Sequence, residues 1–532
     1  MKTYQKHLES THAIGESVSL LRKPIFRSSA IFPVMHNAQF SSRVLYMGYW
    51  LLKRHIPEIQ LLISLRSQSG VLLLRQSIVV DTPKAASIYL ADLINLTPNL
   101  SADSDFLGSL ELEIFSTRDL VYPYPAFVIN YFNDDFCTSV HTTGRIYNDI
   151  EDLQENDAYS VPECGFDIQS DTQFSPFFAF VNGIFAASEQ IVHYTIVDED
   201  NQTSEGIITL KDLKPYQTLV VHFKDHIDLK AILKGKKGAI KLRHNFKGFF
   251  PRFLAGNFQS DKKALSITHT YYDSSDVKDQ NAYWSRSSEE LNDSSVFIPL
   301  FIEQNLYTDL VFYPIYSPSE FTIDMIFYDE NGQFVAQLLH YKYIQTQNKE
   351  LFTLKFKEIL ANNFSKTQLE QIKGVNLIKN WIDKNHIPTR LKFGLNIGTQ
   401  KQNIDLPTNI CFNSQIGNPN VLQKKGTFKW APILNHHQSK IVFTNAGTPK
   451  IYKQNATLQI TFYRENDNQT LGRAFDLKPF GQHTIEILKD PELQQFLQNQ
   501  TGWVTCIADN PFVNGWYFDF QKSGVVAGDH SF

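Results

Sequence analysis

Cysteine is scarce in this chain, and its scarcity limits how the fold can be held together. Four cysteines occur in 532 residues, namely Cys137, Cys164, Cys411 and Cys506, and no two of them form a CxxC pair. Such spacing is not that of a disulfide framework or a zinc ribbon. We therefore expect buried free thiols and a fold that depends on its hydrophobic core.

Long apolar runs and an excess of charge are also missing. Residues 1–21 contain no apolar segment of the signal-peptide kind, and no run reaches the roughly 18 apolar residues of a membrane helix. The formal net charge of −5 gives no strong nucleic-acid signal. We expect a soluble protein that is cytoplasmic because it lacks a signal peptide, with export by a non-cleaved route as the alternative.

The familiar catalytic motifs are absent as well. The sequence contains no HExxH, no GxSxG, no GxxxxGK[ST] and no GxGxxG placed after a predicted strand. The Gly235–Gly238 segment, Gly-Lys-Lys-Gly, follows a predicted helix and is a turn rather than a phosphate loop. Whether the protein is an enzyme is therefore left open by its motifs.

Apolar and aromatic residues, in contrast, are plentiful. Hydrophobic residues make up 42% of the chain, which includes 41 Phe and 23 Tyr, so it can build large cores and strands. At about 100–200 residues per domain, the length predicts several domains.

An internal repeat is the main signal in the sequence. The segments from Asn182 to His269 and from Asn445 to His530 share a first strand, a polar turn between alternating strands, a Lys-Pro pair, a short helix and a final strand that ends in histidine. A third copy fits more loosely. Its helical part is expanded to about 349–384, and its final strand near Cys411 has no histidine. The first copy is the loosest and ends at His141.

The repeat predicts an all-β fold: a tandem array of about four β-sandwich units, Ig-like or jelly-roll-like, with short helical insertions, the largest in the third unit. A four-bladed propeller is the rival, but blades usually run about 40–50 residues. The expected division is an N-terminal arm at 1–34 and β-sandwich repeats at 35–150, 165–285, 295–415 and 428–532.

The repeated histidines are the candidate metal ligands. His141, His269 and His530 occupy equivalent positions in three copies, and neutral imidazole suits Zn, Fe or Cu if the copies pack around one axis. His36 and the His436-His437 pair could add ligands, and Asp273 and Asp529 could be ligands or partners of the ligands. The competing interpretation is that a repeated histidine is only an inherited packing position.

Two further groups of charged residues are candidate ion sites. Asp198, Asp200 and Glu205 lie in an acidic turn that could hold calcium, although the spacing lacks the loop glycine of an EF-hand and a solvated hairpin turn is the favoured explanation. A basic run with interleaved phenylalanines is a candidate anion-binding site, and alternation across a strand is its alternative explanation. The candidate anion-binding residues are Lys236, Lys237, Lys241 and Arg243.

The sequence thus favours a non-catalytic, multi-domain β-sandwich protein with a binding or structural role, engaging a polymer, glycan or protein surface. Exposed aromatic rings that stack on sugar rings are one form of such binding. Five tryptophans are candidates for this role, and a place in the hydrophobic core is the alternative for each of them: Trp50, Trp284, Trp430, Trp503 and Trp516. The alternative is a metal-dependent enzyme with a histidine-ligated site formed between repeats. No cofactor is expected except a transition metal in that alternative, and an oligomer is compatible with either.

Overall fold

The structure is a computed structural model, and it describes most of the chain. The described residues are 11–14, 17–20, 24–122, 125–141, 144–146, 154–157, 163–169, 173–259, 264–270, 283–284, 289–292, 294–313, 319–345, 350–388, 391–400, 406–417, 419–465 and 467–532.

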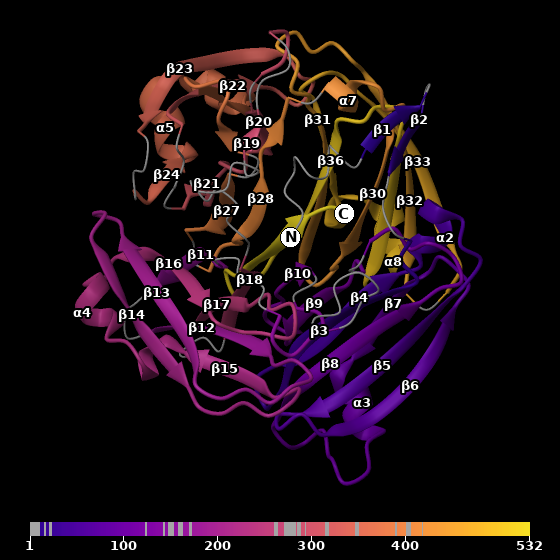
Figure 1. Ribbon diagram of the computed structural model, residues 1–532. Helices are drawn as coiled ribbons and strands as arrows, with labels where there is room; N and C mark the ends of the chain where they lie inside the picture. The colour runs from indigo at the N-terminus through magenta and orange to yellow at the C-terminus, as the bar shows by residue number, and fades with distance from the viewer. Residues whose placement is uncertain are drawn as a thin grey trace.

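The all-β prediction is confirmed. The described residues form seven four-stranded sheets, one five-stranded sheet and two small two-stranded ones, all with antiparallel pairing. Two sheets face each other in each of four units, and the units surround a common centre (Figure 1). No helix in this part of the chain is long and apolar enough to span a membrane.

The first two units have eight strands each. Unit 1 consists of β3 (Arg27–His36), β4 (Ser41–Met47), β5 (Ile59–Ser67), β6 (Leu72–Val80), β7 (Ala85–Tyr89), β8 (Phe106–Phe115), β9 (Val128–Phe132) and β10 (Val140–His141), with helices α2 (Tyr49–Arg54) and α3 (Leu90–Asn95). Unit 2 consists of β11 (Glu163–Gln169), β12 (Phe174–Val181), β13 (Gln190–Asp198), β14 (Thr203–Leu210), β15 (Thr218–His222), β16 (Lys237–His244), β17 (Leu254–Gln259) and β18 (Ala264–His269), with η1 (Phe223–Asp225) and α4 (Leu229–Leu233).

The last two units repeat this series. Unit 3 consists of β20 (Ser294–Pro299), β21 (Leu306–Phe312), β22 (Phe321–Tyr328), β23 (Phe334–Ile344), β24 (Phe352–Lys355), β25 (Gly374–Trp381), β27 (Lys392–Thr399) and β28 (Ile410–Asn413), with α5 (Phe356–Asn363) and α6 (Lys366–Gln371). Unit 4 consists of β30 (Thr427–Ile433), β31 (Gln438–Asn445), β32 (Ala456–Arg464), β33 (Thr470–Leu477), β34 (Gln482–Glu486), β35 (Gly502–Ala508), β36 (Val513–Phe520) and β37 (Val526–His530), with η3 (Ile487–Lys489) and α8 (Pro491–Leu497).

Short elements lie outside the four series. They are β1 (Thr11–Ile14), which pairs with β2 (Ser17–Leu20), then β19 (Tyr283–Trp284), which pairs with β26 (Ile387–Pro388), β29 (Gln415–Ile416) on the edge of the β20 sheet, and α7 (Pro419–Leu422).

Sheet topology is the same in all four units. The first, sixth, third and fourth strands form one sheet in that order, and the fifth, second, seventh and eighth form the other. Each unit therefore has eight strands. In unit 1 the first of them is β3, which spans the expected boundary between the arm and residue 35 and pairs along its whole length with β8. The sheet of unit 1 thus begins at Arg27.

Helices lie between the fifth and sixth strands of every unit, and local sequence accounts for where two of them start. Asp490 caps α8 by accepting a hydrogen bond from Leu493 N, with Pro491 in the first turn. Ser365 and Gln368 form a capping box at α6. The insertion expected over about 349–384 is helical only in part: α5 and α6 lie between β24 and β25, and both flanking strands fall within the expected range.

Adjacent units are joined by one repeated contact. The turn between the third and fourth strands of one unit lies against the start of the fifth strand of the next. Thr218 N donates to Gln68 O at 2.9 Å, Leu351 N to Asn201 Oδ1 at 2.8 Å, and Gln482 N to Glu330 O at 3.0 Å. From unit 4 back to unit 1 the contact is a parallel bridge between Glu465 and Ala85. The four units therefore form a closed ring of head-to-tail interfaces.

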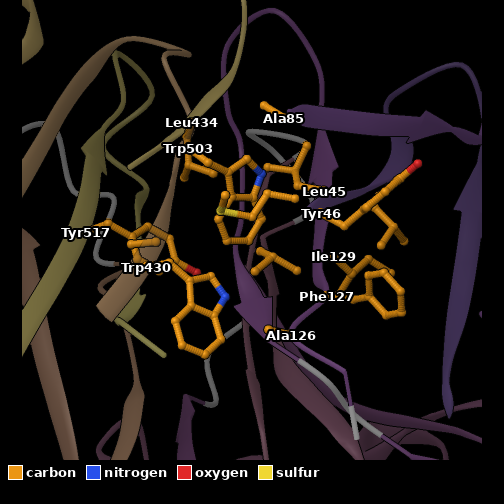
Figure 2. Packing of buried hydrophobic residues seen from close by; sticks show 14 of the residues in the cluster. Leu45, Tyr46, Ala85, Ala126, Phe127, Ile129, Trp430, Leu434, Trp503 and Tyr517 are labelled. Carbon is orange, nitrogen blue, oxygen red and sulfur yellow. The ribbon is translucent and has the colours of Figure 1, made fainter. Parts of the chain in front are cut away.

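The seam between unit 4 and unit 1 is also a hydrophobic core. Leu434, Trp430, Trp503 and Tyr517 face residues of unit 1 such as Leu45 and Ile129 (Figure 2). Tyr49 of α2 stacks on Trp430 with ring centroids 4.5 Å apart. Burial of this kind stabilises by about 25 cal/mol per Å² of apolar surface, so the seam is held by more than hydrogen bonds.

Glycine at one of the ring contacts is required by both conformation and space. Gly332, in the β22–β23 turn, has a φ of +76°, and a Cβ there would lie 2.1 Å from Pro479 O of unit 4. We expect Gly332→Ala to lower the free energy of unfolding by about 1–3 kcal/mol, because it combines a left-handed conformation with a backbone clash. Urea denaturation measures the loss.

The matched control is Gly472→Ala on β33, where a Cβ would meet nothing within 4 Å. Equal free energies of unfolding for the two variants would contradict the conclusion that the β22–β23 turn requires glycine at its contact with unit 4.

Candidate metal centre

The eighth strands of the four units meet at the centre of the ring. β10 contacts β18, β18 contacts β28, β28 contacts β37, and β37 contacts β10. The labels of β10, β18 and β28 lie around the middle of Figure 1, where the C-terminus is also marked. Each of these strands pairs with the seventh strand of its own unit, and that register decides which side chains reach the centre.

One register position carries the repeated histidines. In unit 1, His141 of the eighth strand is opposite Val128 of the seventh, which is opposite Leu45 of the second. In unit 2 the corresponding residues are His269, Leu254 and Ala179. In unit 4 they are His530, Trp516 and Val442. In unit 3 the same register places Cys411 opposite Gly394 and Val311. The third copy thus has a cysteine, another metal-ligand side chain, where the others have histidine.

The structure brings the three histidines together. The ring centroid of His141 lies 4.5 Å from that of His269 and 4.9 Å from that of His530. A metal site at these histidines was expected only if the eighth strands of the units converge. The geometry meets that condition, and metal binding itself stays a prediction.

Hydrogen bonds set the same tautomer on the three rings. Nδ1 of His269 bonds to Thr270 O and Nδ1 of His530 to Ser531 O, each at 2.9 Å. Nδ1 of His141 lies 2.6 Å from Asp529 Oδ2. Because carbonyl and carboxylate oxygens only accept, each Nδ1 is the donor, and Nε2 of the neutral ring carries the lone pair that a metal uses.

Asp529 is the buried carboxylate of the cluster. Its Oδ2 accepts from His141 Nδ1, and its Oδ1 accepts from His530 N at 2.8 Å. Burial alone would raise the pKa of Asp529, but attraction to His141 and His530 and these hydrogen bonds outweigh it and hold the pKa below its ordinary value. Burial also lowers the pKa of His530, which favours the neutral ring that ligates metals.

The ligand atoms already gathered are those of His141, Asp529 and His530, all within 4.8 Å of one another. Cys411 is also buried and lies next to His269: its Sγ donates to His269 O at 3.3 Å and lies 3.6 Å from Thr268 Oγ1. His269 is 1% exposed. Imidazole and carboxylate groups of units 1 and 4 thus meet at the centre, with His269 of unit 2 in contact with His141, and Cys411 of unit 3 next to His269.

The other histidines considered with this site lie elsewhere. His36 has both ring nitrogens engaged, with Ser41 Oγ and Ala102 O. His436 and His437 border a cleft at the seam between units 4 and 1. Asp273 falls outside the described residues.

The acidic turns are hairpin caps. Asp198 Oδ1 accepts from Asp200 N and Gln202 N, and Asp329 Oδ1 does the same with Asn331 N and Gln333 N. Asp200 pairs with Lys236. These carboxylates are used within the turns, as expected of the solvated-turn alternative.

The four candidate anion-binding residues lie on or beside β16. Lys237, Lys241 and Arg243 alternate with the core residues Ile240 and Leu242. Lys236 is paired with Asp200, and all four interleaved phenylalanines are buried: Phe246, Phe249, Phe250 and Phe253. Anion binding by these residues stays a prediction.

Four of the five candidate tryptophans, Trp50, Trp430, Trp503 and Trp516, are buried, and the side chain of Trp284 lies outside the described part. The buried four are core residues and offer no exposed platform to a sugar ring.

The chain matches no known family model and no curated protein sequence. The geometry of the centre therefore carries the functional conclusion.

We expect Asp529→Asn to lower the free energy of unfolding at pH 7 by about 1–3 kcal/mol, because His141 loses its charged acceptor in a buried site. Since the folded pKa of Asp529 lies below the unfolded value of about 3.9, its contribution is present above that value and is lost as pH falls through the folded pKa. Metal-free protein unfolded in urea between pH 3 and 7 tests this.

The variant should show a flatter acid dependence than the wild type, and the exposed control Asp135→Asn should not. Parallel pH profiles for Asp529→Asn and wild type would show that Asp529 is not held ionised by the histidines.

Proposed function

We propose that this chain is a non-catalytic ring of four β-sandwich units that serves a structural or binding role and holds a divalent transition metal at its centre. The observation that carries the proposal is the gathering of His141, Asp529 and His530 within 4.8 Å, with His269 in contact with His141.

Zinc fits this set of groups best. Imidazole nitrogen, thiolate sulfur and carboxylate oxygen are its usual ligands in proteins. With Zn–N bonds of about 2.0–2.1 Å, two ligand atoms on a tetrahedral ion lie about 3.4 Å apart, so small side-chain rotations would bring the present groups into range. Asp529 would act either as a ligand or, through His141 Nδ1, as the carboxylate that orients a ligating histidine.

A metal at this point would have a structural effect. His141 belongs to unit 1 and His530 to unit 4, the first and last units of the ring, and His269 belongs to unit 2. One ion would therefore link strands that are distant in sequence, and binding to the folded ring alone would stabilise it by mass action. The site is also largely buried, with side-chain exposures of 12% for His141 and 5% for Asp529, which favours a closed structural centre.

A metal-dependent enzyme is the second candidate. It is favoured by the side chain of His530, which is 32% exposed and gives solvent an approach to the cluster. Three histidines with one open position are also the ligand set of catalytic zinc sites.

Binding of a protein or glycan surface is supported by two edge strands. β6 exposes Val71, Leu72 and Val79 at or beside its ends, and β23 exposes Phe334, Leu339 and Tyr343. Exposed apolar groups on a sheet edge are the usual material of such contacts.

We expect protein purified without an affinity tag, exposed to Zn²⁺ and desalted, to retain close to one zinc per chain by elemental analysis. A chelator should lower its melting temperature, because at a thousandfold excess over Kd bound metal contributes about 4 kcal/mol. The double variant His141→Gln/His530→Gln should retain no zinc and show no chelator effect.

The control for the double variant is His226→Gln, at an exposed histidine away from the centre. Absence of retained zinc in the wild type, with a melting temperature that a chelator leaves unchanged, would refute the metal centre.

Substitution with Co²⁺ tests the thiol. If Cys411 is a ligand, the Co²⁺-loaded protein should show a thiolate-to-cobalt charge-transfer band in the near ultraviolet that Cys411→Ser removes. Cys137→Ser, at a buried cysteine of unit 1, is the control and should keep the band. A spectrum unchanged by Cys411→Ser would assign the centre to nitrogen and oxygen ligands only.

A further inference from the structure

A polar cleft lies at the seam where unit 4 meets unit 1, away from the metal centre. Its volume is about 560 Å³, which falls in the range of small-molecule sites. Arg43 and Tyr89 line it from unit 1, and His436, Glu465 and Thr501 are among the residues that line it from unit 4.

Arg43 is a buried cation without an acidic partner. It is 7% exposed, and among the residues that the structure describes no carboxylate lies within 4.0 Å of its guanidinium. Two other arginines of low exposure are paired with carboxylates: Arg66 with Glu111 at 3.0 Å, and Arg473 with Asp490 and Glu492. Burial of a charge without a partner costs several kcal/mol, so an anion that enters the cleft would offset that cost.

The guanidinium of Arg43 is held in place before any ligand binds. Its Nε donates to Asn130 Oδ1 at 3.0 Å, and Nη2 lies 3.9 Å from Cys137 Sγ. The guanidinium carbon is 4.7 Å from the ring centroid of Phe132, so the group is stacked as well as hydrogen-bonded. Pre-organisation of this kind reduces the entropy lost when an anion is bound.

His436 provides a second unsatisfied group at the same cleft. Its Nε2 is buried without a hydrogen-bond partner in the described part of the chain. The loop that carries it is fixed, because His436 N and His437 N donate to the Asp519 carboxylate at 3.1 Å. Asp519 is used within unit 4, since it also accepts from Ser439 Oγ and Gln521 Nε2. A buried polar atom without a partner is costly, and a ligand oxygen would satisfy it.

Glu465 sets the chemistry of the rest of the cleft. It is 5% exposed, and its Oε2 accepts from Thr501 Oγ1 at 2.6 Å. A carboxylate here disfavours a second anionic group on the ligand and favours a hydrogen-bond donor.

We propose that this cleft binds a small organic acid that carries one carboxylate and a hydroxyl or amino group. The carboxylate lies against Arg43 and His436, and the donor faces Glu465. The volume of the cleft accommodates acids up to the size of a monosaccharide acid.

Isothermal titration calorimetry with glycolate, glycine and glucuronate tests the proposal, with acetate and inorganic phosphate as comparison anions at equal ionic strength. At least one of the first three should bind in the millimolar range or tighter, and at least tenfold more tightly than acetate, which lacks the donor. Arg43→Gln should weaken that binding at least tenfold, and the exposed control Arg75→Gln should leave it unchanged.

Glu465→Gln keeps the proposal testable if Arg43→Gln fails to fold, because it should reduce the preference over acetate while carboxylate binding persists. Binding of phosphate alone, no binding of the three acids, or equal affinity in every variant would overturn the proposal. None of these outcomes bears on zinc retention, so failure here and failure of the metal centre are distinguishable.

Discussion

Ring closure is the constraint on which the other features of this structure depend. Each unit starts its fifth strand against the third–fourth turn of the unit before it, and the contact recurs at all four seams. Units joined by a head-to-tail interface form either a closed ring or an open filament. Here the rotation from each unit to the next is such that the four units of one chain form a ring. A single sandwich would leave the edge at the start of that strand exposed, which proteins otherwise cover or charge.

The central cluster follows from the same closure. Four eighth strands that meet at one point must place four equivalent side chains there, and polar groups in such a place require partners. Asp529 provides one for His141, and carbonyl oxygens provide them for His269 and His530. The structure therefore accounts for the histidines without a metal as packed and hydrogen-bonded groups. The same hydrogen bonds put the proton of each ring on Nδ1, so that Nε2 carries the lone pair that a metal requires.

Local patterns in the sequence were sufficient for the units but not for the sites. The helix caps formed by Asp490 and Ser365 and the alternation along β16 each depend on only a few neighbouring residues. The sequence alone did not distinguish β3 from an N-terminal arm, because the strand that pairs with it, β8, lies about 80 residues away in the chain. The equivalence of Cys411 with the histidines depends on strand register, and the isolation of Arg43 depends on residues from two units. Neither leaves a local pattern in the sequence.

The contacts between the first and last units also govern how the protein can be made. Ser87 meets Thr501 across 414 positions of the chain, and His141 meets Asp529 across 388. At about 5–20 residues per second, a ribosome needs about 20–80 s to synthesise the chain between the latter two. During that time unit 1 exists with the apolar face around Tyr49 and Leu45 uncovered, since Trp430 and its neighbours have not yet been made. The nascent chain therefore exposes this apolar face until unit 4 has been made and can cover it.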